Sequence, residues 1–256
     1  MRTYAIFTRP DSQLALEVAE DVREIMKGYS LEETDVNKAD LVFIIGGDGT
    51  FLHAMKRDPR GLIFPIKLGR VGFFYEVDVT NYREYINRFF AGRYRVATYR
   101  KIRFLGYECV NEHYITSKNS GKVISAAIYA DGELYRKGLA DGVMISTPLA
   151  STAYSLSVGG PLMDPAIKAA IVNVVSPLGG PIPSLVVNDP KKVLIEVFPD
   201  RRGQKLVTDG IDMKEFNSLI EERPQRGGEF KVIRFGDTGI KRVVRARSKL
   251  SRLRYR

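Results

Sequence analysis

The sequence is short of three features, and each shortage excludes a class of protein. It holds one cysteine, Cys109, so no disulfide can form within the chain, and a cytosolic location is the default expectation. Its longest apolar runs are far shorter than the roughly 20 residues that a membrane-spanning helix needs. The opening residues, MRTYAIFTRP, lack the basic end and apolar block of a signal peptide. These absences favour a soluble, cytoplasmic protein.

The charge of the chain is unevenly distributed. The 256 residues are 44% hydrophobic, enough for one large domain or two ordinary ones, and carry a formal net charge of +10. Eight basic residues and no acid lie in the last sixteen, 241–256, so the charge without them falls from +10 to +2. Because this tail also holds apolar residues, we expect it to pack on the body of the protein. Nucleic-acid binding remains the alternative.

The segment 41–52, LVFIIGGDGTFL, combines an apolar run with a glycine turn. The run predicts a strand buried on both faces that ends at Gly46 and Gly47, and Thr50 is the expected N-cap of a following helix. Free N–H groups at such a helix start suit a phosphate. The pattern is neither a Walker loop nor GxGxxG. Asp48 is the candidate functional carboxylate, and the alternative is that it merely caps the helix.

The first ninety residues alternate between strand and helix patterns, which predicts a parallel sheet with helices on both faces. Ligands gather at the carboxyl ends of such strands, where Asp48 and Gly69-Arg70 would lie. The apolar face of the first helix is expected to hold Leu14, Val18, Val22 and Ile25. Strands are expected at Thr3–Thr8, Leu41–Ile45 and Gly61–Leu68, and helices at Asp11–Lys27, Thr50–Lys56 and Tyr82–Ala91.

From residue 102 onward, short runs rich in β-branched and aromatic residues alternate with turns. The fold class predicted is an α/β N-terminal domain with a parallel sheet, residues 1–92, and a β-rich, sandwich-like C-terminal domain, residues 93–236. A basic tail, 237–256, is expected to pack back on the first domain. The expected strands of the second domain are Ile102–Val110, Val123–Tyr129, Val143–Ser146, Ile171–Val175, Val193–Phe198, Leu206–Thr208 and Phe230–Phe235.

A second unusual segment, 141–161, reads DGVMISTPLASTAYSLSVGGP. Its many hydroxyls and closing glycines predict a long polar loop that can wrap a polyhydroxylated ligand. Asn111-Glu112, expected at the end of a strand, suit ribose hydroxyls or a base edge. The alternatives are a surface turn for Asn-Glu and helix caps for the hydroxyls.

In order along the chain, the motifs GGDGT, GRVGF, NE, DGVMIS and STAYSLSVGGP resemble those of the NAD kinase family. The likeness spans about residues 41–165, and STAYSLSxGGP is far more diagnostic than GGDGT, which diacylglycerol and sphingosine kinases share. The resemblance implies phosphoryl transfer from ATP or polyphosphate to the 2′-hydroxyl of the adenosine ribose of NAD, which gives NADP. It also implies Mg²⁺ or another divalent cation, and a homodimer or homotetramer assembled through the β domain.

The resemblance further implies site residues, whereas the metal ligands stay unknown. Asp48 is expected to accept or orient the proton of the ribose 2′-hydroxyl, as suits a carboxylate beside phosphate-binding amides. His53 and Lys122 have plain alternatives as a helix-face histidine and a solvated lysine. Contacts to NAD are expected from Asp48, Gly49, His53, Asn111, Glu112, Lys122, Asp141, Thr152, Ala153, Tyr154, Ser155, Leu156 and Ser157. Phosphate contacts are expected from Gly46, Gly47, Gly49 and Thr50.

Some residues depart from the pattern of the family and leave the phosphoryl donor, acceptance of NADH and product inhibition open. The alternative functions are a lipid or sugar kinase that uses GGDGT, or a non-catalytic NAD(P)- or nucleic-acid-binding protein on the same fold. The departures are Lys67, Leu139, Leu149, Ala150, Leu178 and Ile211.

Overall fold

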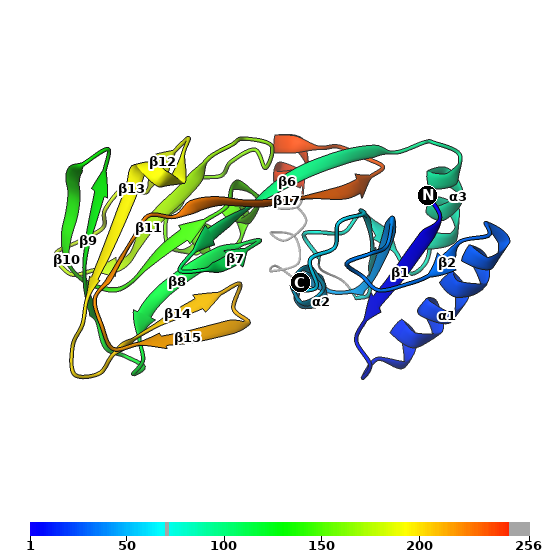
Figure 1. Ribbon diagram of the computed structural model, residues 1–256. Helices are drawn as coiled ribbons and strands as arrows, with labels where there is room; N and C mark the ends of the chain where they lie inside the picture. The colour runs from blue at the N-terminus through cyan, green and yellow to red at the C-terminus, as the bar shows by residue number, and fades with distance from the viewer. Residues whose placement is uncertain (70–71, 246–256) are drawn as a thin grey trace, which may run out of the picture. The chain divides into compact units, whose positions relative to one another are not determined.

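The computed structural model describes residues 1–69 and 72–245 of the chain (Figure 1). The chain divides into two compact units, the first formed by Met1–Tyr99 with Phe230–Arg242 and the second by Arg100–Glu229 with the described residues 243–245. The predicted fold class, an α/β unit followed by a β-rich unit, is confirmed. None of the helices in these two ranges is long and apolar enough to cross a membrane.

The first unit is built on a largely parallel sheet. Its order is β2-β1-β3-β4-β17-β6-β7, where β7 is Tyr107–Cys109, and β5 pairs with β4. All six residues of β3 are buried because helices cover both faces, as an apolar run in a parallel sheet requires. The strands are β1 (Thr3–Thr8), β2 (Glu32–Glu33), β3 (Leu41–Gly46), β4 (Leu62–Lys67), β5 (Val77–Asp78), β6 (Arg95–Phe104) and β17 (Gln225–Arg234).

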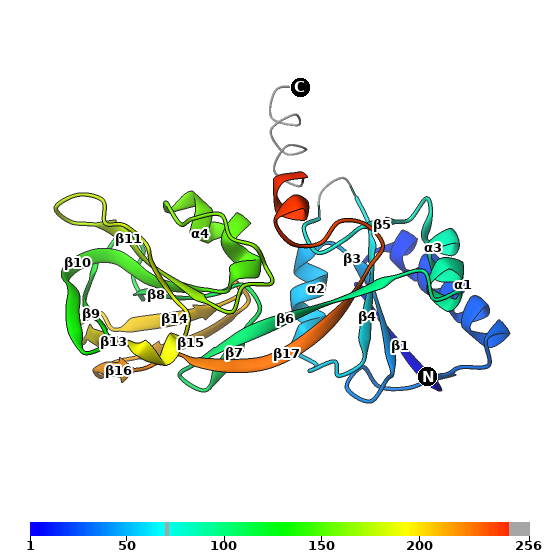
Figure 2. The ribbon, with the colours of Figure 1, turned by 90° about the horizontal axis from the view of Figure 1, so that it is seen from above.

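Three helices pack on this sheet. They are α1 (Gln13–Gly28), α2 (Asp48–Met55) and α3 (Tyr82–Phe90), and Figure 2 shows α1 and α3 on one face and α2 on the other. Phe43 and Phe64 lie in the core cluster that β3 and β4 form with α1 and α3. Helix α2 begins at Asp48, directly after the carboxyl end of β3 at Gly46.

Two details of the helices differ from the prediction. The buried face of α1 is formed by Ala15, Val18, Ala19, Val22 and Met26, whereas Leu14 is 49% exposed, because the helix is rotated by about one residue. Helix α2 begins at Asp48 with Gly47 as its N-cap, two residues earlier than expected. Thr50 is therefore a buried residue of the first turn and not a cap.

The second unit is an antiparallel sheet of order β15-β14-β8-β10-β9-β13-β16, to which β11 and β12 are added beside β10. The long strand β10 pairs with β9 along its first part and with β8 and β11 along its last part. The strands of this sheet are β8 (Glu112–Ser117), β9 (Ile124–Ala130), β10 (Glu133–Ser146), β11 (Ala170–Pro177), β12 (Leu185–Val187), β13 (Val193–Phe198), β14 (Gln204–Thr208), β15 (Asp212–Phe216) and β16 (Ile220–Glu222).

Three expectations for the β strands are wrong in detail. The strand expected at 102–110 is a hairpin, because Leu105 and Gly106 have φ values of 51° and 83° and turn the chain between β6 and β7. The polar segment 141–161 begins as the end of β10 and continues as the short helices η1 (Pro148–Thr152) and α4 (Tyr154–Ser157). The run at 230–235 pairs parallel with β4 and so belongs to the first unit.

Candidate functional site

Asp48 is the first residue of α2 and directly follows the glycine turn at the end of β3. Its carboxylate accepts the backbone N–H of Phe73, at 2.9 Å from Oδ1 and 3.1 Å from Oδ2, and that of Phe74, at 3.3 Å. The N-cap of α2 is Gly47, which makes no side-chain capping bond. Asp48 therefore binds a distant loop, and the alternative that it merely caps its own helix is not what the structure shows.

Tyr75 adds a second tie between this loop and the glycine turn. Its hydroxyl donates to the carbonyl of Gly47 at 2.7 Å. Burial, and next the charge of Asp48, raise the pKa of Tyr75, so the hydroxyl keeps its proton and remains a donor. The residues Phe73–Tyr75 thus hold both the carboxylate and the backbone beside it. Arg70, in the same loop, lies outside the described residues.

The glycines of the turn have different steric roles. A Cβ on Gly46 would lie 2.4 Å from Oγ1 of Thr50, so only glycine lets α2 pack this closely on the end of β3. No described atom lies within 4 Å of a Cβ added to Gly47 or Gly49. The backbone there is open on the side where the N–H groups of a helix start are free to bind an anion.

His53 is exposed on α2. Five residues of an α-helix turn by about 140° beyond a full circle, so His53 and Asp48 point to different sides of the helix. Within α2 alone, the structure does not bring these two side chains together.

In the second unit, Asn111 and Glu112 lie at the start of β8 and are held by a residue far along the chain. Asp209, at the turn after β14, accepts the backbone N–H groups of Val110 at 2.9 Å, Asn111 at 2.7 Å and Glu112 at 3.2 Å. Sequence reasoning did not assign Asp209 a role. The only local signal was an Asp-Gly pair directly after a strand pattern, which also fits any turn.

Two polar atoms beside Asn111 are without partners. Among the described residues, Oε2 of Glu112 and Oγ of Ser146 are buried and make no hydrogen bond, and these two residues are opposite each other in the β8–β10 pair. Burial, and next the charge of Asp209, raise the pKa of Glu112 to about 7. Because buried polar atoms are normally hydrogen-bonded, this pair is suited to bind hydroxyl or amino groups of a ligand.

The hydroxyl-rich segment divides into internal and outward-facing members. Thr147 donates to the carbonyl of Val110 at 2.7 Å, Ser151 donates to the carbonyl of Met163 at 3.3 Å, and Ser155 donates to the side chain of Asn173 at 3.0 Å. These three side chains are buried, whereas Thr152, Ala153, Leu156 and Ser157 are partly or fully exposed. The buried hydroxyls fix the segment, and its other residues are available to a ligand.

Asp141 lies further along β10 from Ser146, about 17 Å away at 3.4 Å per residue. Its carbonyl accepts the hydroxyls of Tyr114 at 3.2 Å and Thr116 at 2.7 Å, and the ring of Tyr114 packs edge-on against that of Tyr154. Lys122 is exposed in the loop after β8, at the opposite end of that strand from Glu112. The candidate NAD residues of the second unit are therefore spread along the sheet.

The residues that depart from the expected pattern occupy varied places. Lys67 forms an ion pair with Asp78 at 3.1 Å. Leu139 and Leu178 are exposed, and the N–H of Leu178 donates to the carbonyl of Leu139 at 2.8 Å. Leu149 lines the pocket described next.

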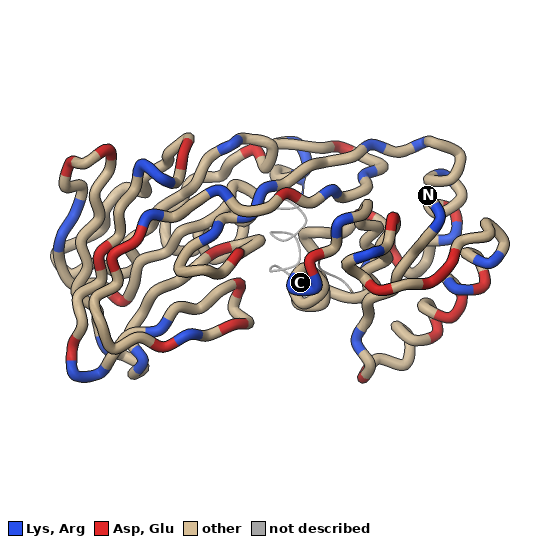
Figure 3. The backbone as a smooth tube through the Cα atoms, in the orientation of Figure 1, with Lys and Arg blue, Asp and Glu red and all other residues tan. Residues whose placement is uncertain are grey.

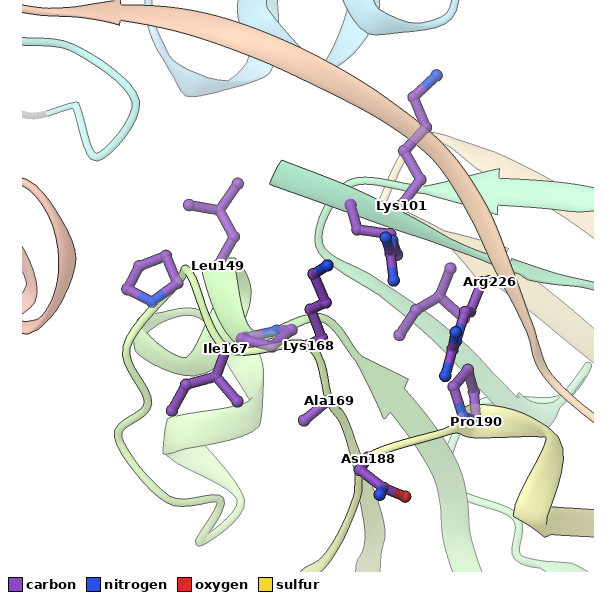
Figure 4. A pocket seen from close by; sticks show the side chains of 12 residues that line it. Lys101, Leu149, Ile167, Lys168, Ala169, Asn188, Pro190 and Arg226 are labelled. Atoms are coloured by element: carbon purple, nitrogen blue, oxygen red, sulfur yellow. The ribbon is translucent and has the colours of Figure 1, made fainter. Parts of the chain in front are cut away.

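Basic side chains surround a pocket of about 400 Å³ in the second unit, part of which is open solvent (Figure 4). Arg100, Lys101, Lys168 and Arg226 line it together with apolar residues. Arg100 is paired with Glu229, Lys101 lies 3.5 Å from Glu108, and Arg226 lies 3.1 Å from Asp189. Nearby carboxylates thus offset much of its positive charge. In both units basic and acidic positions are interspersed along the chain (Figure 3).

A parallel sheet with a carboxylate at its glycine turn, and a β unit with an Asn-Glu pair and a hydroxyl-rich segment, are the features of a phosphotransferase that acts on a nucleotide. The sequence model of the ATP-NAD kinase N-terminal domain matches residues 5–94, and that of the ATP-NAD kinase C-terminal domain matches residues 110–219. The chain belongs to the NAD kinase family.

Similar proteins agree with this assignment. An NAD kinase of Thermococcus sibiricus is 33% identical over 215 residues, which cover 81% of this chain and 76% of that protein. An NAD kinase of Pyrococcus abyssi is 31% identical over 262 residues, which cover 91% of this chain and 94% of that protein. The fold is similar to the crystal structure of an NAD kinase from Archaeoglobus fulgidus in complex with ATP, with a TM-score of 0.79, 22% identity, and coverage of 98% of this chain and 99% of that chain.

Proposed function

We propose that this protein is an NAD kinase, which phosphorylates the 2′-hydroxyl of the adenosine ribose of NAD and produces NADP. The match of both domains to the family supports this activity over a lipid or sugar kinase and over a non-catalytic binding protein. The observation that carries the assignment of the site is the carboxylate of Asp48, fixed by two backbone N–H groups at a glycine turn.

Asp48 is the proposed proton acceptor. In the reaction the ribose 2′-oxygen forms a bond to the terminal phosphorus of the donor, the bond from that phosphorus to the bridging oxygen breaks, and ADP leaves when the donor is ATP. The hydroxyl proton passes to the carboxylate of Asp48. The free N–H groups of Gly47 and Gly49 and the start of α2 are proposed to bind phosphate and offset its negative charge, and Gly46 and Thr50 to shape that turn.

The second unit is proposed to hold NAD. The carboxylate of Glu112 and the amide of Asn111 are suited to ribose hydroxyls and base nitrogens, and the buried Oε2 of Glu112 has no competing protein partner among the described residues. Thr152 through Ser157 are proposed to line the dinucleotide, with Asp141 towards the nicotinamide. His53 and Lys122, both exposed, remain proposed basic contacts.

A divalent cation is proposed to reach the protein together with the phosphates. In the described ranges no group of three His, Cys, Asp or Glu side chains could hold a metal ion. Mg²⁺ typically binds through one or two carboxylates, water and substrate phosphates. Mg²⁺ would offset the charge of the transferred phosphoryl group.

Two further proposals concern assembly and location. The second unit exposes large apolar side chains, so we expect it to form the interface of a homodimer or homotetramer. A cytoplasmic location is proposed because the single cysteine, Cys109, is buried and NAD and ATP are intracellular metabolites. The exposed apolar residues include Leu134, Leu139, Leu178, Val186, Met213 and Leu219.

The activity is tested with purified protein, NAD and Mg²⁺, in parallel reactions with ATP, other nucleoside triphosphates and polyphosphate. A dehydrogenase specific for NADP reports the product. The expected result is NADP formation with at least one donor, and the comparison identifies which donor is used. Absence of NADP with every donor would refute the kinase assignment.

The role of Asp48 is tested with Asp48→Asn, which keeps the size of the side chain and leaves one oxygen that can accept the N–H groups of Phe73 and Phe74. We expect kcat to fall about 10²- to 10⁴-fold, as for loss of a positioned base, while NAD still binds by calorimetry. An unchanged kcat would remove Asp48 from this role and leave the family assignment intact.

A further inference from the structure

The backbone groups that hold Asp48 are themselves held by two arginines near the end of the chain. Arg234, the last residue of β17, donates from Nη1 to the carbonyl of Phe74 at 2.6 Å. Arg242, in the helical residues 239–245, donates from Nη2 to the carbonyl of Phe73. All of these residues belong to the first unit.

One peptide group links Arg242 directly to Asp48. The carbonyl of Phe73 and the N–H of Phe74 are the two ends of the same peptide, so this peptide accepts from Arg242 at its oxygen and donates to Asp48 at its nitrogen. A cation on a carbonyl oxygen polarises the peptide and makes its N–H a stronger donor, and such bonds reinforce each other at low dielectric. The guanidinium therefore acts on the carboxylate through one rigid, planar group.

The surroundings fix both arginines in place. Arg234 has no exposed surface, and its Nε and Nη2 lie 3.4 Å and 3.3 Å from the hydroxyl of Tyr99. The side chain of Arg242 is 12% exposed and pairs with Oε1 of Glu76 at 2.8 Å. The other oxygen, Oε2 of Glu76, accepts the N–H groups of Phe235 and Gly236 at 2.9 Å and 3.1 Å. Moving either guanidinium away would take a cation from the partly buried carboxylate of Glu76, which is costly.

The two guanidiniums also lie close to the same acidic side chain. Two guanidiniums share one carboxylate, Glu76, which lies 3.8 Å from Arg234 and 2.8 Å from Arg242. Burial, and next the charge of Arg234, lower the pKa of Arg242 to about 10, so it remains a cation near neutral pH. A structural ion pair needs only one arginine. The second cation is aligned with the peptide that leads to Asp48.

We propose that Arg242 is a positioning residue for phosphoryl transfer, which orients the carboxylate of Asp48 through the Phe73–Phe74 peptide, and that Arg234 holds the next carbonyl of the same loop. The proposal rests on the proposed role of Asp48. On this proposal the segment Phe230–Arg242 contributes to catalysis as well as to packing. The orientation of Asp48 matters because a base displaced by about 1 Å can lose about 10²-fold in rate.

The test compares Arg242→Met with Lys241→Met, a change of the neighbouring exposed basic residue in the same helical stretch. We expect Arg242→Met to lower kcat about 10- to 100-fold with KM for NAD within about 3-fold. Lys241→Met should match the wild type. A wild-type kcat in Arg242→Met would overturn the proposal.

A double mutant separates positioning from a general structural effect. In the Asp48→Asn background, Arg242→Met should lower kcat by no more than about 3-fold, because its effect passes through the missing carboxylate. Equal losses in both backgrounds would mean that Arg242 acts elsewhere and would refute the proposal. If Asp48→Asn alone has wild-type kcat, the proposed role of Asp48 fails as well, so the two failures are distinguishable.

Arg242→Lys keeps the test decisive if the methionine variant does not fold. Lysine retains the charge beside Glu76 but lacks the planar fork that contacts a carboxylate and a carbonyl together. We expect wild-type melting and a kcat reduced about 3- to 10-fold, with KM for NAD within about 3-fold. Full activity in this folded variant would contradict a role for the fork.

Discussion

Replacement of Glu112 by glutamine should change how the stability of the protein depends on pH. Burial and the charge of Asp209 raise the pKa of Glu112 from 4.5 in the unfolded chain to about 7 in the folded protein. The folded protein therefore retains a proton that the unfolded chain releases between these two values. Stability is consequently unaffected below pH 4.5, decreases as pH rises from 4.5 to 7, and carries the full penalty above pH 7.

The magnitude follows from the size of the shift. At 1.36 kcal/mol per unit, a pKa raised from 4.5 to about 7 corresponds to about 3 kcal/mol of lost stability above pH 7. Glu112→Gln removes the ionisation, so at pH 8 the variant should melt roughly 10 °C above the wild type, whereas at pH 4 the two should melt together.

The assay is thermal unfolding followed by circular dichroism between pH 4 and pH 8, without NAD, because a ligand that contacts Glu112 would alter its ionisation. Glu133→Gln, at an exposed glutamate at the start of β10, is the matched control and should follow the wild type at every pH. A difference between Glu112→Gln and the wild type that does not vary with pH would refute the reasoning. So would a variant that is less stable than the wild type at pH 8.

Three further changes test the fold around the two sites, each by its melting temperature. Gly46→Ala should destabilise the protein by about 1–3 kcal/mol, because the new Cβ would lie 2.4 Å from Oγ1 of Thr50. Gly47→Ala meets no atom within 4 Å and should destabilise it less, by the loss of a favourable N-cap residue alone. Burial lowers the pKa of His113 from 6.5 to about 4, so the wild type should lose stability as pH falls from 6.5 towards 4, and His113→Gln should lose less. Truncation after Ile240 should lower the melting temperature, and unaltered melting together with lost DNA affinity would instead favour nucleic-acid binding by the tail.

The parts of the fold that follow from local pattern were predicted well. The apolar run at 41–45 implied a strand covered on both faces, and β3 is buried throughout. The glycine turn at Gly46 and Gly47 was expected from the same stretch. The phase of α1 was wrong because Ala15, Ala19 and Met26 complete its buried face, and alanine gives little signal of burial in a sequence.

The contacts that define the sites could not be predicted, because they join main-chain groups to side chains far away in the sequence. The carboxylate of Asp48 is held by N–H groups 25 and 26 residues later, and Asp209 holds N–H groups 97 to 99 residues earlier. Every residue except proline offers a backbone N–H, so the sequence carries no mark of which ones are used. The parallel pairing of β17 with β4 could not be predicted from the sequence for the same reason, because it is made by backbone groups.

The hydroxyl-rich segment shows why composition alone did not separate structural residues from candidate ligand residues. Thr147, Ser151 and Ser155 are buried and bonded within the protein, so the alternative reading of these hydroxyls as structural holds for them. Gly160 packs directly on Ser155, and no larger residue fits there, because a Cβ on Gly160 would lie 2.2 Å from Oγ of Ser155. The same motif therefore builds a rigid turn and presents its remaining side chains outward. A binding loop on a scaffold needs both properties, since a ligand that bound a flexible loop would first have to order it.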